Sequence, residues 1–298
     1  MIKTKADWKN GEDDKSYGFA IWPIVDYVGV YGLEHPEKSL EVLKTLTPLF
    51  SAEFAIRPFL QQHFKITYNT MLEWSKDKDE HVRRLSSEGI RPRLPWGERL
   101  NQFIDDPKPI LKILENLKDD ENEFVRRSVA NNLNDISKDH PELVTEVCKK
   151  WLAKPNKERE WIAKHATRGL VKKGYSNALE LLGFAKDPKI EVADFLIASD
   201  KLDLGEELIF SFEVVSKAKI KQKLVVDYII HFMKQNGRMS GKVFKLKNFD
   251  LNAETNKILL KKHRIKNIST RKYYSGKHKL DLMINGKVYK EIEFELNV

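Results

Sequence analysis

The segment SSEGIRPRLPWG, residues 86–97, brings together residue types that could hold a phosphate around an acid. A glycine and a proline that follow Glu88 should end a helix there, so that Arg91, Arg93 and Trp96 project from a stiffened loop. Guanidinium groups bind phosphate oxygens bidentately, and an indole can stack on a base or a sugar. The spacing predicts a phosphate clamp around a carboxylate. The alternative is a tryptophan in the core, with arginines that pair with nearby acids.

The helical segment that contains Glu88 belongs to a repeat. Apolar anchors superpose in four segments, the first of them loosely, and paired arginines superpose in the second and third: AIRPFLQQHF (55–64), DKDEHVRRLSSEGI (77–90), DDENEFVRRSVANNL (119–133) and WIAKHATRGL (161–170). A period of about 40 residues is typical of a HEAT-like superhelical solenoid built from helical hairpins.

One polar position recurs in this register, as Gln62, Glu88, Asn131 and Arg168. We expect it to line a concave groove, although it would also fit a solvated face.

The hydrophobic period divides the chain into two domains. Apolar residues recur three and four apart up to about residue 200, and from about 205 they alternate in six or seven short segments. Asn285-Gly286 stands between alternating apolar positions and predicts a tight hairpin turn. We therefore expect an all-α solenoid over residues 1–204 and an all-β, immunoglobulin-like sandwich over residues 205–298.

Charge is placed unevenly along the chain. The net charge is +9, and the excess of basic residues lies beyond residue 200. Such asymmetry favours a polyanionic partner, although a solvated lysine-rich surface would look the same. In the basic segment 261–279, Arg271 and Lys272 adjoin two tyrosines, which suits a second contact with DNA. The alternative places one tyrosine in the core of the sandwich.

Several classes of site and location are disfavoured. The single cysteine, Cys148, excludes an intramolecular disulfide and a cysteine-cluster zinc site, and no histidines stand at metal-ligand spacing. We expect no metal, no cofactor and no membrane span, because no apolar run approaches the roughly 20 residues that a span needs. The N-terminus lacks the apolar core of a signal peptide, so we expect a soluble cytoplasmic protein of bacterial type that associates with the nucleoid when bound to DNA.

The chain resembles the AlkC-type DNA alkylation repair proteins, which are related to the AlkD-type enzymes among the HEAT-like DNA glycosylases. The resemblance is carried by FSAEFAIRPFL (50–60), HVRRLSSEGIRPRLPWG (81–97), FVRRSVANNLNDISKDHP (124–141) and WIAKHATRGLVKKG (161–174). AlkC-type members also carry a C-terminal immunoglobulin-like domain. The resemblance implies a monofunctional glycosylase that excises cationic bases such as 3-methyladenine, with 3-methylcytosine as a further substrate, without flipping the base.

A cationic base leaves readily, so the enzyme need only stabilise the developing sugar cation and position a water. We expect Glu88 to be this carboxylate. Glu123 is a second candidate, although a carboxylate at a helix start also interacts favourably with the helix dipole. Asp135 is a third.

We expect the protein to be a monomer that binds double-stranded DNA containing alkylated bases. The remaining candidate residues are expected to contact this DNA. They are Arg57, Arg91, Arg93, Trp96, Arg126, Arg127, Asn131, Trp161, Lys164, Arg168, Arg271 and Lys272. Either Arg126 or Arg127 could instead point away into an inter-repeat ion pair, and Trp161 could be pure core. Two other functions stay open: a HEAT-repeat protein that binds damaged or distorted DNA without cutting it, and a protein–protein scaffold.

Overall fold

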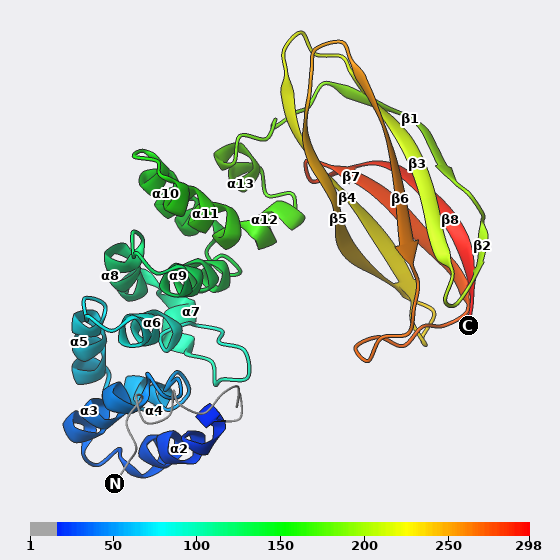
Figure 1. The fold of residues 1–298 in the computed structure, drawn as a ribbon. Helices are drawn as coiled ribbons and strands as arrows, with labels where there is room; N and C mark the ends of the chain where they lie inside the picture. The colour runs from blue at the N-terminus through cyan, green and yellow to red at the C-terminus, as the bar shows by residue number, and fades with distance from the viewer. Residues whose placement is uncertain (1–16) are drawn as a thin grey trace. The chain divides into compact units, whose positions relative to one another are not determined.

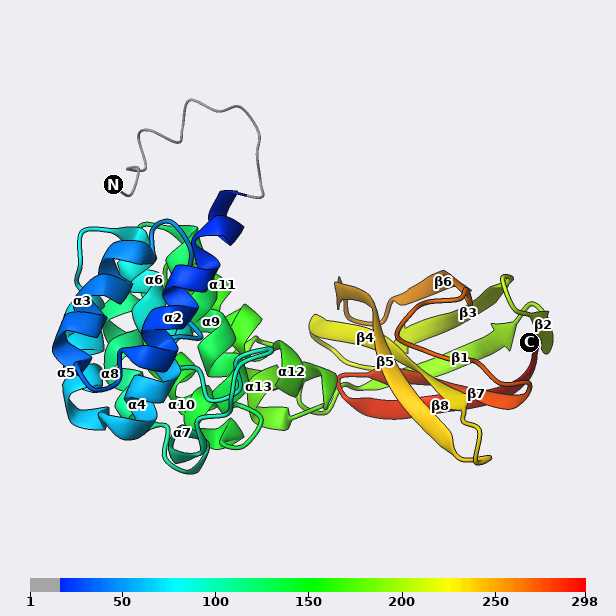
Figure 2. The same ribbon diagram turned by 90° about the horizontal axis from the view of Figure 1, so that it is seen from below.

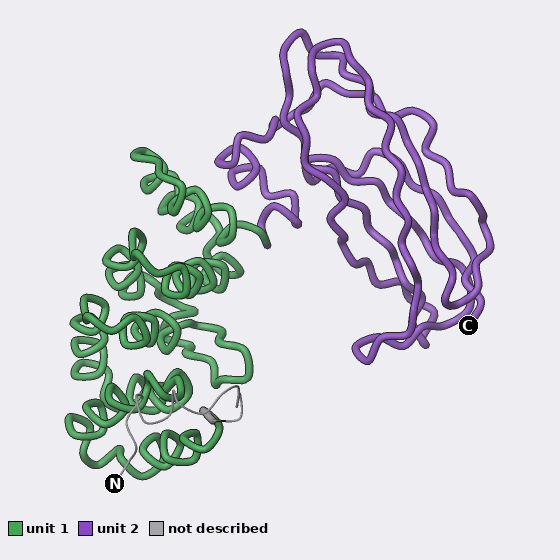
Figure 3. Tube along the Cα trace, in the orientation of Figure 1, with its two compact units in different colours: residues 1–168 green, residues 169–298 purple. Residues whose placement is uncertain are grey.

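A computed structural model of the protein describes residues 17–298, which fall into two compact units divided between Arg168 and Gly169 (Figure 3). The first unit is helical. Its elements are η1 (Tyr17–Ala20), α2 (Trp22–Tyr31), α3 (Pro36–Leu46), α4 (Ile56–Gln62), α5 (Phe64–Trp74), α6 (Glu80–Glu88), α7 (Asn101–Asp105), α8 (Lys108–Leu117), α9 (Glu123–Ile136), α10 (Pro141–Leu152) and α11 (Lys157–Ala166). Among residues 17–298, no helix is long and apolar enough to cross a membrane.

The helices of the first unit are layered in two rows. In one row α9 packs between α6 and α11, and the other row contains α5, α8 and α10 (Figures 1 and 2). The three helices of the first row begin in the same way, because the side chains of Asp79, Asn122 and Asn156 accept a hydrogen bond from the first turn of α6, α9 and α11. Such caps satisfy backbone N–H groups that lack a partner within the helix.

An arginine near the start of each helix in this row holds the preceding loop. Arg83 donates to the carbonyls of residues 77 and 78, Arg126 to those of residues 120 and 121, and Arg159 to that of residue 154. Arg83 also forms an ion pair with Asp120 of the next loop along the chain. Arg83 and Arg126 occupy the same position of the predicted repeat and make the same contacts, whereas Arg159 makes its contact from outside the predicted register.

The apolar anchors of the repeat are buried for three of its four segments. Val82, Val125 and Ile162 are buried at the first anchor, with Ile90, Leu133 and Leu170 at the last. The first, loosely matched segment differs, because α4 ends at Gln62 and its expected anchor Phe64 is 40% exposed at the start of α5. The alignment of that segment was wrong at its C-terminal end.

The second unit joins two short helices to a β sandwich. The helices are α12 (Arg168–Lys172), whose first residue belongs to the first unit, and α13 (Ser176–Leu181). The strands are β1 (Ile190–Ile197), β2 (Lys201–Asp203), β3 (Glu207–Ser216), β4 (Gln222–Met233), β5 (Met239–Leu251), β6 (Asn256–Arg264), β7 (Gly276–Ile284) and β8 (Lys287–Asn297). One sheet has the order β1-β3-β6 and the other β2-β8-β7-β4-β5, and all pairings are antiparallel except that of β2 with β8.

The change from helix to strand comes earlier than residue 205. Strands β1 and β2 lie before it, so residues 190–204 belong to the β domain and not to the helical one. The short strand β2 and the bulge between Ala193 and Leu196 in β1 interrupt the alternation of buried and exposed residues that is regular in β3. The sequence of residues 190–204 therefore lacks a clear hydrophobic period of two.

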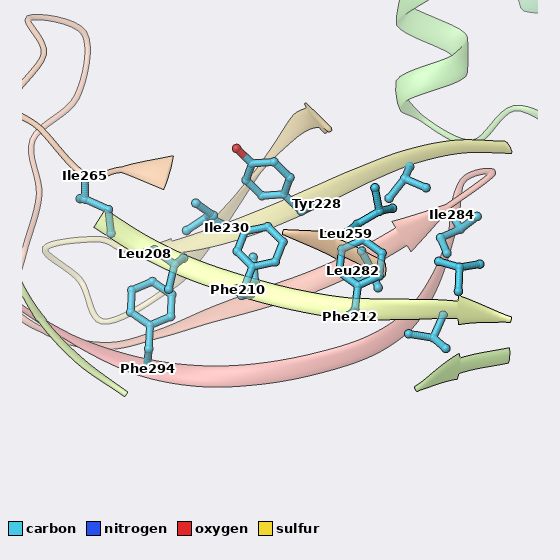
Figure 4. Close-up of a cluster of buried hydrophobic side chains, with 14 of the residues drawn as sticks. Leu208, Phe210, Phe212, Tyr228, Ile230, Leu259, Ile265, Leu282, Ile284 and Phe294 are labelled. Carbon is cyan, nitrogen blue, oxygen red and sulfur yellow. The ribbon is translucent and has the colours of Figure 1, made fainter. Parts of the chain in front are cut away.

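The core of the sandwich lies between the two sheets. Figure 4 shows aromatic and aliphatic side chains from both of them, among them Phe210 and Phe212 of β3 opposite Leu282 of β7. The predicted turn joins β7 to β8, with Asn285 at φ 45° and Gly286 at φ 78°. Gly286 also touches the backbone of Gly174 closely enough that a Cβ on either would clash, and this contact holds the turn against the α12–α13 connection.

Candidate active site

Glu88 is the last residue of α6 and is 5% exposed. The Nη1 of Arg91 lies 2.5 Å from its Oε1, and the Ser128 hydroxyl of α9 donates to its Oε2 at 2.6 Å. A carboxylate oxygen can accept two hydrogen bonds, so each oxygen retains capacity for a water or a substrate group. The helix end predicted after Glu88 is confirmed, and it directs the chain back so that Arg91 meets the carboxylate three residues earlier.

Arg91 joins Glu88 to a second carboxylate. Its Nε donates to Oδ2 of Asp135 on α9 at 2.8 Å, and Lys138 reaches Oδ1 of Asp135 at 2.8 Å. Burial alone would lower the pKa of Arg91, but the charges of Glu88 and Asp135 outweigh it and the pKa is raised. The guanidinium of Arg91 is buried and occupied by two carboxylates, which argues against the predicted phosphate contact.

The cluster continues beyond Glu88 to residues that the sequence did not single out. Nη1 of Arg84 lies 2.8 Å from Oε2 of Glu53, and its Nη2 lies 3.8 Å from Oε1 of Glu88. The guanidinium of Arg84 also covers the ring of Phe124, 4.6 Å from the centroid. Charges therefore alternate from Glu53 through Arg84, Glu88 and Arg91 to Asp135.

Arg57 was expected to bind DNA, and the structure contradicts this. Its side chain is 1% exposed and donates to the carbonyls of Gly89 at 2.9 Å, Arg91 at 3.0 Å and Glu98 at 2.9 Å. Burial, with a smaller effect of Arg91, lowers the pKa of Arg57 to about 10, so the group stays charged at neutral pH. Arg57 holds both ends of the loop 89–98 and has no access to a phosphate.

The tip of this loop is open to solvent. Trp96 is fully exposed and has φ 62°, a left-handed conformation that bulky residues rarely adopt. A strained and exposed aromatic residue is typical of a binding site, and the structure rules out the alternative of a core anchor. Arg93 is partly exposed and forms a bidentate pair with Asp139, both contacts at 2.8 Å. Within this loop, therefore, Arg91 is buried and Arg93 lies at the surface.

Residues from α9 and α11, with Arg168 at the start of α12, form a second polar cluster. The Asn131 side-chain oxygen accepts from Nη2 of Arg168 at 3.1 Å and lies 3.1 Å from Nε2 of His165. Burial, with the charges of Arg168 and Arg127, lowers the pKa of His165, which is neutral at pH 7. The half-buried Trp161 stacks on His165 with ring centroids 4.9 Å apart, and Lys164 is exposed. Of the predicted polar row, Asn131 and Arg168 are hydrogen-bonded, whereas Gln62 is an exposed residue at the end of α4.

The two arginines of α9 have different neighbours. Arg126 donates to carbonyls of the preceding loop, as described above, so its guanidinium is held at the start of its own helix and not in an inter-repeat ion pair. Arg127 is exposed and pairs with Glu123 in the same helix at 2.5 Å, not with another repeat. Arg127 lowers the pKa of Glu123, which lies on the surface at the helix start and outside the Glu88 cluster.

In the second unit, the basic segment lies between β6 and β7. The Arg271 guanidinium is 4.0 Å from the ring centroid of Phe232, and Lys272 is exposed beside Tyr274. Tyr273 is buried in the sandwich core, which is the alternative left open for one tyrosine.

Comparison with known proteins identifies the family. A model described as DNA alkylation repair enzyme matches residues 50–170, and a model of the C-terminal Ig-like domain of the uncharacterised protein YhaZ matches residues 191–298. The uncharacterized protein YhaZ of Bacillus subtilis is 42% identical over 271 residues, which are 91% of this chain and 75% of that protein. The alkylpurine DNA glycosylase AlkC of Pseudomonas fluorescens, solved with DNA containing an abasic site analog, is 42% identical, with a TM-score of 0.90 over 94% of this chain and 78% of that one.

The chain belongs to the AlkC-type family of DNA alkylation repair proteins. Its helical region followed by an Ig-like β domain is the architecture of this family, and its first unit contains the segment matched by the repair-enzyme model. This supports a DNA glycosylase of alkylation repair.

Among residues 17–298, no group of three or more His, Cys, Asp or Glu side chains could hold a metal ion. Of the residues missed from the sequence, Arg84 and Ser128 could have been found from helical spacing, since Arg84 precedes Glu88 by one turn. Glu53 could not, because it lies in an irregular segment before α4.

Proposed function

We propose that this protein is a monofunctional DNA glycosylase that hydrolyses the glycosidic bond of cationic N-alkylated bases, 3-methyladenine and also 3-methylcytosine, without base flipping. The observation that carries the proposal is the carboxylate of Glu88, held on both oxygens and with acceptor capacity left on each. In the reaction, positive charge moves from the base to the sugar. A fixed carboxylate stabilises that charge better than water does, because it needs no reorganisation when the charge develops.

We propose that the protein acts as a monomer and that its partner is double-stranded DNA. We propose that the first unit is a HEAT-like superhelical solenoid whose row α6–α9–α11 faces the DNA. The side chains available for its backbone and sugar are the surface residues Arg93, Trp96, Arg127, Trp161, Lys164 and Arg168 with Asn131. Arg271 and Lys272 of the Ig-like domain supply a second contact. Phosphate contacts of this kind give salt-dependent affinity without sequence preference, which suits a protein that scans for lesions.

The proposal is tested by base release from methylated duplex DNA, measured by mass spectrometry. We compare wild type, Glu88→Gln and Glu115→Gln, the last a control carboxylate on α8 that pairs with Lys118 and Trp151. We expect wild type and the control to release methylated base, and Glu88→Gln to be slower by at least about 100-fold while still binding DNA.

Equal rates in wild type and Glu88→Gln would contradict the assignment of Glu88. DNA binding by wild type without base release would favour the non-catalytic damage-binding protein. Absence of salt-dependent DNA affinity would favour the protein–protein scaffold. Thermal unfolding of each variant separates these outcomes from loss of the fold.

A further inference from the structure

Arg91 stands between two buried carboxylates that come from different helices. Glu88 ends α6 and Asp135 lies in the last turns of α9, and each places an oxygen within 2.8 Å of the same guanidinium. The side chains of all three residues are less than one-tenth exposed. Two carboxylates brought together in a poorly solvated site repel each other, and one of them takes up a proton unless a cation intervenes.

We propose that Arg91 is a positioning residue that offsets the repulsion between Glu88 and Asp135 and fixes Glu88 in the orientation needed for excision. This inference rests on the proposed function, because it assumes that Glu88 acts on the substrate. It replaces the phosphate-binding role expected of Arg91 from the sequence.

The geometry suits a guanidinium and no other cation. Arg91 uses its Nε for Asp135 and its Nη1 for Glu88, two donors in the fixed plane of one group. The backbone of Arg91 is held as well, since Arg57 donates to the carbonyls of Gly89 and Arg91. With Ser128 on the other oxygen, Glu88 has donors from two separate elements and little freedom to rotate.

Other charged groups around the pair do not replace Arg91. Arg84 lies 3.8 Å from Glu88 but makes its shorter contact, 2.8 Å, with Glu53. Lys138 reaches only the far oxygen of Asp135 and is half exposed. The charged groups that face Glu88 and Asp135 from the neighbouring elements are Glu53, Arg57, Arg84, Arg93, Lys138 and Arg168.

The test compares Arg91→Gln and Arg91→Lys with wild type and with Arg83→Gln. Arg83 is a matched structural control, because it also forms a partly buried ion pair between repeats, with Asp120 of the loop before α9, outside the Glu88 cluster. The readouts are the single-turnover rate of base release at saturating protein from pH 5 to 9, the affinity for DNA containing an abasic site analogue, and thermal unfolding.

We expect Arg91→Gln to slow base release by about 100-fold at pH 7, the usual effect of losing one fixed electrostatic group in an active site. The acid limb of its pH profile should move up by about one pH unit or more, because the carboxylates lose the cation that favours their charged form. Arg91→Lys should restore the position of the acid limb, since it restores the charge, but only part of the rate. Arg83→Gln should lower stability and leave the acid limb where it is in wild type.

Two results would overturn the inference. One is an Arg91→Gln variant with weaker DNA affinity, a shallower salt dependence and an unchanged saturated rate, because that describes a phosphate ligand. The other is a pH profile in folded Arg91→Lys and Arg91→Gln identical to that of wild type. Failure of the proposed function looks different, because Glu88→Gln measured in parallel would then release base at the wild-type rate.

Discussion

Replacing Arg57 tests whether a buried cation holds the loop that carries Arg91 and Trp96. In Arg57→Met, the buried carbonyls of Gly89 and Arg91 lose their donor, and the packing of the aliphatic stem is largely kept. A buried carbonyl without a partner costs about 1–3 kcal/mol, so the two together cost about 2–6 kcal/mol. Part of this cost is offset, because the substitution also removes the buried charge of Arg57, which is unfavourable in itself, as its lowered pKa indicates. We expect a net loss of about 2–4 kcal/mol in the free energy of unfolding.

Arg57→Lys should be at least as destabilising as Arg57→Met. A lysine retains the cost of burying a cation, but its single ammonium cannot donate to three carbonyls at the positions that the guanidinium serves. The control is Arg93→Met in the same loop, whose partly exposed pair with Asp139 should contribute less than about 1 kcal/mol.

The assays are urea unfolding and thermal unfolding, both followed by tryptophan fluorescence. All six tryptophans precede residue 169, so the signal reports the helical unit alone. At roughly 2–4 °C per kcal/mol for a unit of this size, the expected loss lowers the unfolding temperature by about 4–16 °C. A change in stability below about 0.5 kcal/mol, or a lysine variant as stable as wild type, would refute the account of Arg57 as the clamp of this loop.

Two further predictions concern the exposed loop and the β domain. Trp96→Gly should change the free energy of unfolding of the helical unit by less than about 1 kcal/mol relative to wild type, because the indole is fully exposed and glycine accepts φ 62°. Its affinity for DNA should fall by about 10-fold through loss of stacking. Unchanged affinity would show that Trp96 does not contact DNA. Burial, with nearby Lys261 and Arg271, lowers the pKa of His263 to about 4, so the unfolded state takes up a proton first and His263 costs stability as the pH falls from about 6.5 to about 4. Over this pH window the free energy of unfolding of wild type should therefore fall by about 1–2 kcal/mol more than that of His263→Gln, as measured by unfolding followed by far-UV circular dichroism. Burial raises the pKa of Asp227 to about 6, which has the opposite effect on stability, but Asp227 is common to both proteins. Parallel curves of stability against pH would contradict the argument.

The sequence by itself determined the succession of helices and strands and most of their limits. Glycine and proline after Glu88 ended α6 where expected, and Asn285-Gly286 formed the turn between β7 and β8, because both depend on local backbone preferences. The repeated apolar anchors were also readable, since Val82 and Val125 are buried for the same reason in each repeat. The early strands β1 and β2 were missed, because a bulge and a short length remove the alternation on which the prediction depends.

The tertiary structure decided what each charged side chain does. Arg57, Arg91 and Arg93 have the same chemistry, yet the first is held by carbonyls, the second by two buried carboxylates and the third by a surface aspartate. No local pattern separates these roles, because each depends on a partner from another element. Asp135 lies close to Arg91 only because α6 and α9 pack side by side, and that packing brings the two carboxylates into one site.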